Sequence, residues 1–128
     1  IAGLNFGIKY IKSKGIKLIY NHEKKLLDIF IKELKKNPKI VIYGPTNILE
    51  RSGVVPINII NMDSSEVSYL LDTKYSIAVR SGLHCAPLAH KTLGTEKIGA
   101  VRFSVGPFNT KKDIIAAVKA LNEISLAE

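Results

Sequence analysis

Apolar residues recur at helical spacing over the first third of the chain. Over residues 1–14 they return every three or four positions, which predicts a helix that stops at Gly15. A second helix is predicted from an N-cap at Asn21 to the Asn37-Pro38 pair, because proline does not continue a helix. The apolar positions of these two helices are Ile1, Leu4, Ile8, Ile11, Leu27, Phe30, Ile31 and Leu34.

Short runs rich in β-branched residues predict strands at 39–43, 54–62, 77–80 and 99–105. Pro56 should place the start of the second run near a sheet edge, because proline has no N–H to donate to an inner ladder. Asp63 and Glu66 form a capping-box-like pair that opens a short helix. Thr110 and Asp113 match the same pattern ahead of an amphipathic C-terminal helix.

The predicted elements indicate the fold class. Their order is two helices, two strands, a helix, two strands and a helix. Strands grouped in this way predict an α+β fold with a mainly antiparallel sheet and helices packed on it. The 128 residues are 46% hydrophobic and contain no low-complexity run, so we expect one folded domain over residues 1–128. The connection 81–98 is predicted to be irregular, and either mobile or only partly ordered.

Positive charge is concentrated in the first part of the chain. Residues 1–53 hold 11 Lys and Arg against 4 Asp and Glu, and 11 − 4 gives +7 of the total of +8. Such an excess could attract nucleic acid or an acidic partner. Because the lysines fall between the core positions of the predicted helices, a solvated helix surface is the favoured interpretation. No nucleic-acid partner is therefore expected.

Three features of the sequence bear on the setting of the protein. A single cysteine, Cys85, excludes an internal disulfide and suits a reducing, intracellular compartment. No apolar stretch reaches the length of a membrane span, so no association with a membrane is expected. The chain opens at Ile1 without a methionine and enters a helical pattern at once. We therefore expect it to be a segment of a longer protein.

Candidate chemistry is concentrated in the long connection 81–98. Cys85 lies beside His84, with Arg80 and His90 nearby, and such cations favour a reactive thiolate. A lone cysteine is also commonly a small buried apolar residue, and composition alone favours that role. His84, Cys85 and His90 could instead bind a metal, but structural zinc sites usually have two pairs of ligands, so no metal is expected. His22, at the start of a predicted helix, is interpreted as a surface residue.

Arg102 interrupts the apolar run of the last predicted strand. Its guanidinium group is a rigid fork of donors that suits a carboxylate or a phosphate. A strand with one face in water also permits an outward-facing charge of no special role. The two interpretations are about even on the sequence pattern alone.

Taken together, these residues resemble the C-terminal part of class V aminotransferases, in the branch of cysteine desulfurases and selenocysteine lyases. The resemblance rests on the run from Arg80 to Cys85 (RSGLHC), then Arg102, then Phe108-Asn109-Thr110. It extends back through residues 1–14, 20–23 and 43–45, and so covers nearly the whole chain. Two departures are Leu83, where many relatives have His, and the run APLAH after the cysteine. Both suggest a side branch of the family.

The resemblance implies roles for individual residues. It implies that Cys85 is the persulfide-forming cysteine, that Arg102 holds the substrate carboxylate, and that Arg80, Gly82 and His84 shape the loop. It also implies that this chain is the small C-terminal domain of a fold-type I enzyme dependent on pyridoxal 5'-phosphate (PLP). The lysine that forms the Schiff base would then lie upstream, in a large PLP-binding domain that this chain lacks. We therefore expect this chain alone to bind no PLP and to be inactive.

The same resemblance implies the biochemical context. The full-length protein would be a cytoplasmic homodimer that moves sulfur from L-cysteine to Cys85 and releases alanine. A sulfur-acceptor protein is a possible partner, with iron–sulfur cluster assembly as the wider process. The alternatives are a selenocysteine lyase or another class V aminotransferase and, from a different class, a stand-alone sulfur-carrier or interaction domain. In this chain alone, where no large domain covers the connection 81–98, Cys85 should be accessible to solvent.

Overall fold

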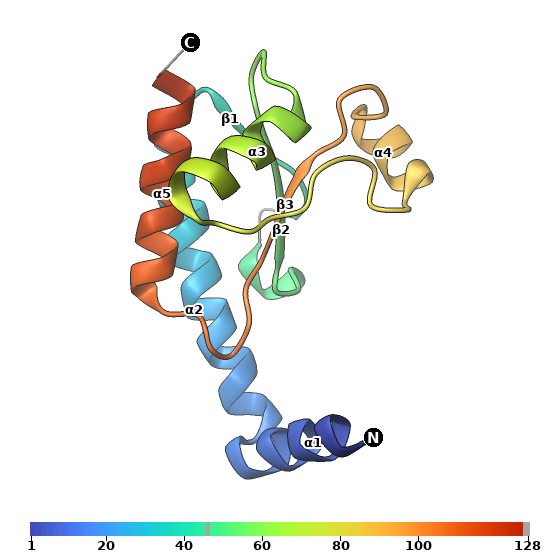
Figure 1. The fold of residues 1–128 in the computed structure, drawn as a ribbon, viewed down its shortest axis with the longest axis vertical. Helices are drawn as coiled ribbons and strands as arrows, with labels where there is room; N and C mark the ends of the chain where they lie inside the picture. The colour runs from blue at the N-terminus through green and yellow to red at the C-terminus, as the bar shows by residue number, and fades with distance from the viewer. Residues whose placement is uncertain (46, 127–128) are drawn as a thin grey trace.

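Three short strands pair into one antiparallel sheet in the order β1-β2-β3 (Figure 1). They are β1 (Ile40–Ile42), β2 (Val54–Ile59) and β3 (Val101–Ser104). The structure is a computed structural model that describes residues 1–45 and 47–126. The predicted α+β fold with an antiparallel sheet and packed helices is confirmed.

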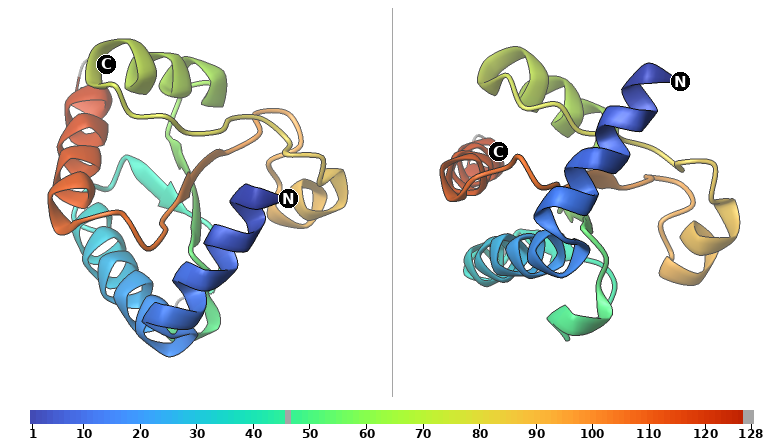
Figure 2. Two further views of the ribbon diagram at one scale, coloured as in Figure 1. Left: turned by 60° about the horizontal axis from the view of Figure 1, so that its bottom comes forward. Right: turned by 90° about the horizontal axis from the view of Figure 1, so that it is seen from below.

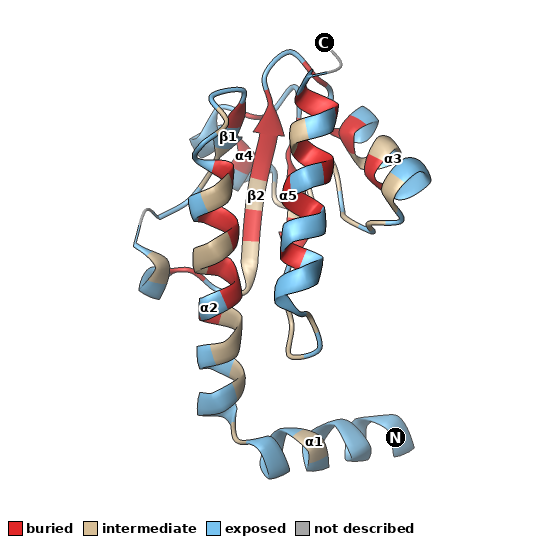
Figure 3. Cartoon of the chain, turned by 90° about the vertical axis from the view of Figure 1, so that its left-hand side faces the viewer, coloured by how far each residue is buried: buried red, intermediate tan, exposed pale blue. Residues whose placement is uncertain are grey.

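Helices cover one face of this sheet and leave the other face open. On the covered side lie α2 (Ile16–Leu34), α3 (Ser64–Tyr75) and α5 (Lys111–Leu126), and Figure 2 shows α2 and α5 together on one side of the strands. Side chains alternate along a strand, so every second residue of β2 points into the core. The fully or nearly fully buried core side chains include Leu27, Phe30, Leu34, Val55, Ile57, Ile59, Leu71, Val101 and Leu121. Figure 3 shows this buried surface facing inward from α2 and α5 onto β2.

Helix α1 (Ala2–Lys14) projects away from the sheet, as Figure 1 shows, and contains no buried residue. Gly15, at φ 83°, ends α1, and α2 begins at the next residue. The predicted N-cap at Asn21 is therefore wrong, because one glycine in the left-handed region redirects the chain without a linker. Among the described residues, no helix is long and apolar enough to cross a membrane.

Two predictions about strands are wrong. Pro56 lies in the central strand, and it is tolerated there because its nitrogen faces β1 just beyond Ile42, where that strand ends. Residues 77–80 form no regular strand, since only Arg80 pairs with β3, in an isolated bridge to Arg102. The connection 81–98 is also more regular than predicted, because α4 (Pro87–Leu93) lies within it. Pro87 suits the start of that helix, where its missing N–H costs no hydrogen bond.

The predicted caps at Asp63 and at the Thr110–Asp113 pair are confirmed, whereas no hydrogen bond from Glu66 back to Asp63 is found among the described residues. Asp63 accepts a hydrogen bond from the backbone N–H of Ser65 at 2.7 Å. The Asp113 carboxylate accepts from the N–H of Thr110 at 2.7 Å, and the Thr110 hydroxyl accepts from the N–H of Asp113 at 3.4 Å. These bonds hold the pKa of each carboxyl group below its usual value, mainly through the backbone N–H in each case.

One lysine departs from the predicted solvated surface. Lys24 is buried, and its ammonium group donates to the carbonyl oxygens of Ile48, Leu49 and Arg51. It thereby anchors the short 3₁₀ helix η1 (Ile48–Glu50) against α2. A buried ammonium requires such partners, so Lys24 has a structural role in joining β1 to β2.

Candidate functional site

Arg80 and Arg102 are neighbours across the edge of the sheet. The backbone N–H of Arg102 donates to the carbonyl oxygen of Arg80 at 2.7 Å. The backbone N–H of Arg80 donates in turn to the carbonyl oxygen of Arg102 at 3.3 Å. Directly opposed residues project to the same face, and Arg102 also opposes Pro56 on β2. Val101 and Phe103, on either side of Arg102, are in the core. Both arginine side chains therefore extend from the open face.

Neither arginine has an acidic partner among the described residues. The ion pairs found there all join a lysine to a carboxylate three or four residues earlier or later in the chain. The Nε atom of Arg102 is buried and makes no hydrogen bond. Two like charges directly opposed across strands repel each other. The pair thus concentrates positive charge and has guanidinium N–H groups without acceptors in the described residues, which suits an anionic ligand.

His84 lies beside this pair and is held as a neutral base. Its Nε2 donates to the carbonyl oxygen of Ala100 at 3.0 Å, so Nδ1 carries the lone pair. Nδ1 is buried and has no partner in the described residues. Burial is the main cause that lowers the pKa of His84 below its ordinary value of 6.5, and repulsion from Arg102, His90 and Arg80 adds to it. The bond to Ala100 opposes this shift.

Cys85 is presented by a tight turn. The N–H of Ala86 donates to the carbonyl oxygen of Leu83 at 2.8 Å, which closes a turn over His84 and Cys85. Both central residues are in the left-handed region, with φ 51° for His84 and 58° for Cys85. Residues other than glycine occupy that region at a cost, and such strain is concentrated at functional sites. Cys85 is exposed, which confirms its predicted accessibility.

Gly82 and Gly99 hold the base of this turn against β3. The N–H of Ala100 donates to the carbonyl oxygen of Gly82 at 3.1 Å. A Cβ atom added at Gly99, whose φ is 63°, would lie 2.6 Å from the Cα atom of Gly82. Gly99 is therefore required both for its backbone angle and for this close approach. This role of Gly99 was not predicted, although a glycine in a strand often marks a bulge, a bend or a close approach of another backbone.

His90 supports the turn from α4. It is buried, and its Nδ1 and the hydroxyl of the buried Thr95 share a hydrogen bond of 2.7 Å. Its ring centroid lies 5.8 Å from that of His84. The structure thus places His90 beside His84, within a hydrogen-bonded pair that the sequence did not reveal. No group of three or more His, Cys, Asp or Glu that could hold a metal occurs in the part of the chain that the structure describes.

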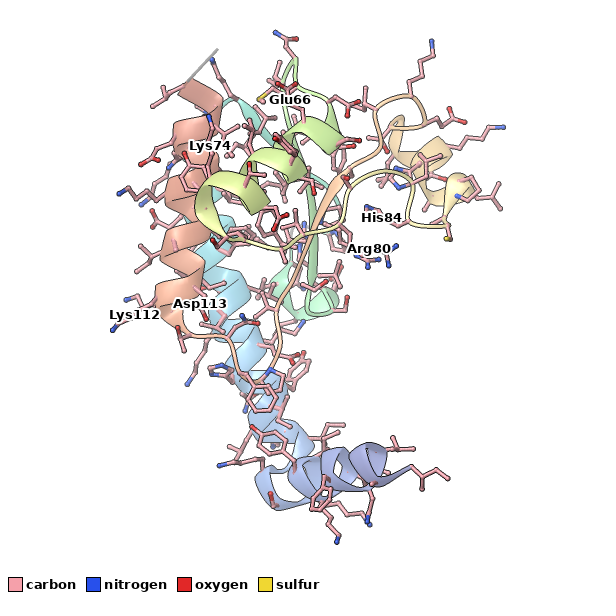
Figure 4. All side chains as sticks on the ribbon, in the orientation of Figure 1. Glu66, Lys74, Arg80, His84, Lys112 and Asp113 are labelled. Carbon is pink, nitrogen blue, oxygen red and sulfur yellow. The ribbon has the colours of Figure 1, made fainter. Side chains whose placement is uncertain are left out.

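The candidate site lies away from the start of α5. Figure 4 shows Arg80 and His84 on the segment between α3 and α4, away from Lys112 and Asp113 at the start of α5. His22, which was expected at the surface, is instead half-buried on α2, and its Nε2 lies 2.8 Å from the carbonyl oxygen of Asn109. It fixes the turn before α5 and is not part of the site.

The described residues offer no lysine placed to form a Schiff base with PLP. Its chemistry requires a lysine amine held in a pocket. Every lysine of the chain is exposed except Lys24, whose ammonium group is already bonded to three carbonyl oxygens. The donor set on the open face suits an anionic group such as a carboxylate.

Comparison with known proteins points to one family. The family model described as aminotransferase class-V matches residues 1–116. A probable cysteine desulfurase of Methanothermobacter thermautotrophicus is 36% identical over 125 residues, which cover 96% of this chain and 30% of that protein. A probable cysteine desulfurase of Staphylococcus epidermidis is 34% identical over 121 residues, which cover 94% of this chain and 28% of that protein.

The similar solved structures are also those of cysteine desulfurases. The apo structure of a cysteine desulfurase from Thermococcus onnurineus NA1 has a TM-score of 0.89 at 32% identity, over 95% of this chain and 30% of that chain. The cysteine desulfurase CsdA (S-sulfonic acid) from Escherichia coli has a TM-score of 0.78 at 25% identity, over 90% of this chain and 27% of that chain. The chain thus spans less than a third of the length of these relatives. Since the family model covers most of its residues, this chain belongs to the class-V aminotransferase family.

Proposed function

We propose that this chain supplies the substrate-binding arginine and the sulfur-accepting cysteine of a cysteine desulfurase. The observation that carries the proposal is the bond from His84 Nε2 to the carbonyl oxygen of Ala100, because it joins the residue before Cys85 to the strand segment that carries Arg102 two positions later. The names of the similar proteins support sulfur chemistry on L-cysteine.

Arg102 would hold the carboxylate of the substrate. Its side chain leaves the sheet on the open face, and its Nε has no partner in the described residues. A bidentate guanidinium–carboxylate contact fixes both the position and the orientation of a small amino acid. Arg102 would thereby bring the substrate sulfur within reach of the turn that carries Cys85.

Cys85 would accept the sulfur atom. Its thiolate attacks the sulfur of L-cysteine, and an S–S bond forms as the bond between that sulfur and Cβ breaks. The bonding electrons stay with Cβ, which takes up a proton, so the products are alanine and a persulfide on Cys85. Exposure of Cys85 also lets the persulfide reach an external acceptor.

His84 would support the bound substrate. Because Nε2 is held by Ala100, the Nδ1 lone pair is free to accept a hydrogen bond from a polar group of the ligand. Gly82 and Gly99 keep this ring in place by fixing the base of the turn. Arg80, Gly82 and His84 are thus proposed to position the reacting groups.

The remainder of the catalytic machinery would lie outside this chain. PLP, when bound to the full-length protein, supplies the electron sink that makes the bond between sulfur and Cβ breakable. We propose that residues 1–128 form the small C-terminal domain of that protein, and that the PLP-binding lysine belongs to its large domain. This chain alone would then bind no PLP and show no turnover. A homodimer, a cytoplasmic location and delivery of sulfur to an acceptor protein for iron–sulfur cluster assembly complete the proposal.

The test uses the full-length protein that contains this chain, loaded with PLP and given L-cysteine. Mass spectrometry should find one additional sulfur atom on the peptide that carries Cys85, together with released alanine. Cys85→Ala should abolish persulfide formation and leave the PLP absorbance unchanged. Leu88→Ala, at an exposed residue of α4, is the matched control and should behave as the wild type.

Three results would contradict the proposal. Undiminished turnover by Cys85→Ala would exclude Cys85 as the sulfur acceptor. Reaction with selenocysteine but not with cysteine would indicate a selenocysteine lyase. Acceptance of sulfur from another protein, without release of alanine from cysteine, would indicate a sulfur-carrier domain.

A further inference from the structure

Two buried polar side chains hold the base of the connection that carries Cys85. Asn58, on β2, is 4% exposed, and its Nδ2 donates to the carbonyl oxygen of Gly99 at 2.9 Å. Ser64, at the start of α3, is 2% exposed, and its hydroxyl donates to the carbonyl oxygen of Ile98 at 2.7 Å. Two successive carbonyl groups of the chain are thus each bonded to a buried side chain, and the two side chains come from different elements of the fold.

The amide of Asn58 is not fully satisfied where it lies. Its Oδ1 is buried and has no hydrogen-bond partner in the described residues. A buried polar atom without a partner destabilises the folded chain. The Nδ2 atom, by contrast, also donates to the hydroxyl oxygen of Tyr43 at 3.2 Å. The contribution of this side chain is therefore its donor, which holds the carbonyl group of Gly99.

Gly99 connects this donor to the turn of Cys85. A Cβ atom at residue 99 would lie 2.6 Å from the Cα atom of Gly82, so the two backbones meet directly. The N–H of Ala100 donates to the carbonyl oxygen of Gly82 at 3.1 Å. The carbonyl oxygen of Ala100 accepts from Nε2 of His84 at 3.0 Å. A shift of the Gly99 peptide would therefore move both His84 and Cys85.

The far end of the connection meets the same glycine. The N–H of Gly99 donates to the carbonyl oxygen of Thr95 at 2.8 Å, and the Thr95 side chain is bonded to the ring of His90. Both ends of the connection 81–98 are thus fastened at Gly99. Asn58 joins that point to the central strand of the sheet.

We propose that Asn58 is a positioning residue for the turn of Cys85, with Ser64 as a second support. By fixing the carbonyl group of Gly99, Asn58 sets the place of Cys85 and keeps His84 in the tautomer that carries its proton on Nε2. The part of Cys85 in the reaction rests on the proposed function, whereas the coupling of Asn58 to the turn rests on the hydrogen bonds alone.

The first experiment measures the NMR chemical shifts of the two ring nitrogens of His84 in the 128-residue chain, at a pH well above 6.5, where the ring is neutral. The wild-type chain should show one tautomer, with the proton on Nε2. Asn58→Leu keeps a branched side chain but removes the donor, so the shifts should move toward the average of the two tautomers. Ser64→Ala is a milder change and should move them less, in the same direction.

Asn37→Leu is the matched control. The Nδ2 atom of Asn37 also donates two hydrogen bonds, both of 2.8 Å, and both go to side chains of α5. This variant should lower the free energy of unfolding and leave the shifts of His84 unchanged. It therefore separates positioning of the turn from a general loss of stability.

The second experiment measures the reaction of the full-length, PLP-loaded protein with L-cysteine. Asn58→Leu should lower kcat roughly 10- to 100-fold, because a displaced Cys85 is out of line with the substrate sulfur. KM should change less than about twofold, because Arg102 stays in the pairing of β2 with β3.

The outcomes separate this proposal from the proposed function. Unchanged shifts of His84 in a folded Asn58→Leu chain would overturn the positioning role, as would equal changes in Asn37→Leu. If Asn58→Leu does not fold, unchanged shifts in Ser64→Ala decide against it. Altered shifts with a wild-type kcat would show that the place of the turn does not affect the reaction. Altered shifts together with full turnover by Cys85→Ala would instead refute the role of Cys85 and leave the coupling in place.

Discussion

The two faces of the sheet differ in how completely their atoms are satisfied. On the face covered by α2, α3 and α5, the side chains of Val55, Ile57 and Ile59 are apolar and buried. On the open side, three buried polar atoms of the described residues have no hydrogen-bond partner, namely Asn58 Oδ1, His84 Nδ1 and Arg102 Nε. Buried polar atoms are nearly always paired in folded proteins. The covered face is therefore complete in this chain, whereas the open face needs a ligand or a covering surface.

The two faces contribute differently to the free energy of folding. Burial of apolar surface on the covered face supplies most of the free energy of folding. The open face instead holds charged groups apart from counter-charges, which does not favour folding. The comparison predicts that changes on the covered face act on stability, and that changes on the open face act on binding and reaction.

The largest effect on stability should come from the covered face. Leu27→Ala removes a fully buried side chain and should lower the free energy of unfolding by about 2–5 kcal/mol. Urea unfolding followed by circular dichroism measures this change. Ile115→Ala, on the exposed side of α5, is the control and should cost less than about 1 kcal/mol. Equal losses in the two variants would show that α2 does not form the core described here.

A smaller effect should come from the backbone contact that joins the two regions. Gly99→Ala places a methyl group against Gly82, and we expect a loss of about 2–3 kcal/mol in the free energy of unfolding. Gly94→Ala has a similar φ, 69°, and no atom within 4 Å of the added Cβ, so about 1 kcal/mol is expected. Equal losses would show that only the backbone angle, and not the close approach to Gly82, is important at residue 99.

The smallest effect should be a pH dependence that arises from His84. Its folded pKa lies below its unfolded value of 6.5, so between the two values the unfolded chain binds more protons. The stability contributed by neutral His84 is therefore present above 6.5 and is lost as the pH falls toward the folded pKa. His84→Gln should flatten this part of the profile of unfolding free energy against pH. An unchanged profile would show that the ring is not buried in its neutral form.

The sequence predicted the covered face better than the open face. Helical periodicity of apolar residues is a direct consequence of burial on one side, so Leu27, Phe30 and Leu34 were placed correctly in the core. The two caps, at Asp63 and Thr110, depend on local spacing alone and were also predicted. The position of Pro56 was not, because it depends on where a separate strand, β1, ends.

The open face was predicted only as a set of residue types. Alternation placed Arg102 on one side of its strand, but it could not tell which side the helices cover. The pairing of Arg80 with Arg102 depends on an isolated bridge that no local pattern specifies. The bond from Lys24 to the carbonyl oxygens of η1 is equally non-local, so a lysine assigned to the surface proved to be buried. The roles given to Cys85 and Arg102 remain predictions that follow from the family resemblance.

The most direct test of the central claim is the effect of Arg102→Lys on the full-length, PLP-loaded protein. The substitution keeps the charge but removes the planar fork. The transition state of the reaction with L-cysteine should therefore lose about 2–4 kcal/mol of stabilisation, which lowers kcat/KM roughly 30- to 700-fold. The free energy of unfolding of the 128-residue chain should change by less than about 0.5 kcal/mol, because the Arg102 side chain has no ion-pair partner there. This combination would show that the open face serves the reaction and the covered face the fold. Unaltered kinetics, with or without a loss of stability, would show that Arg102 is only a surface charge of the sheet.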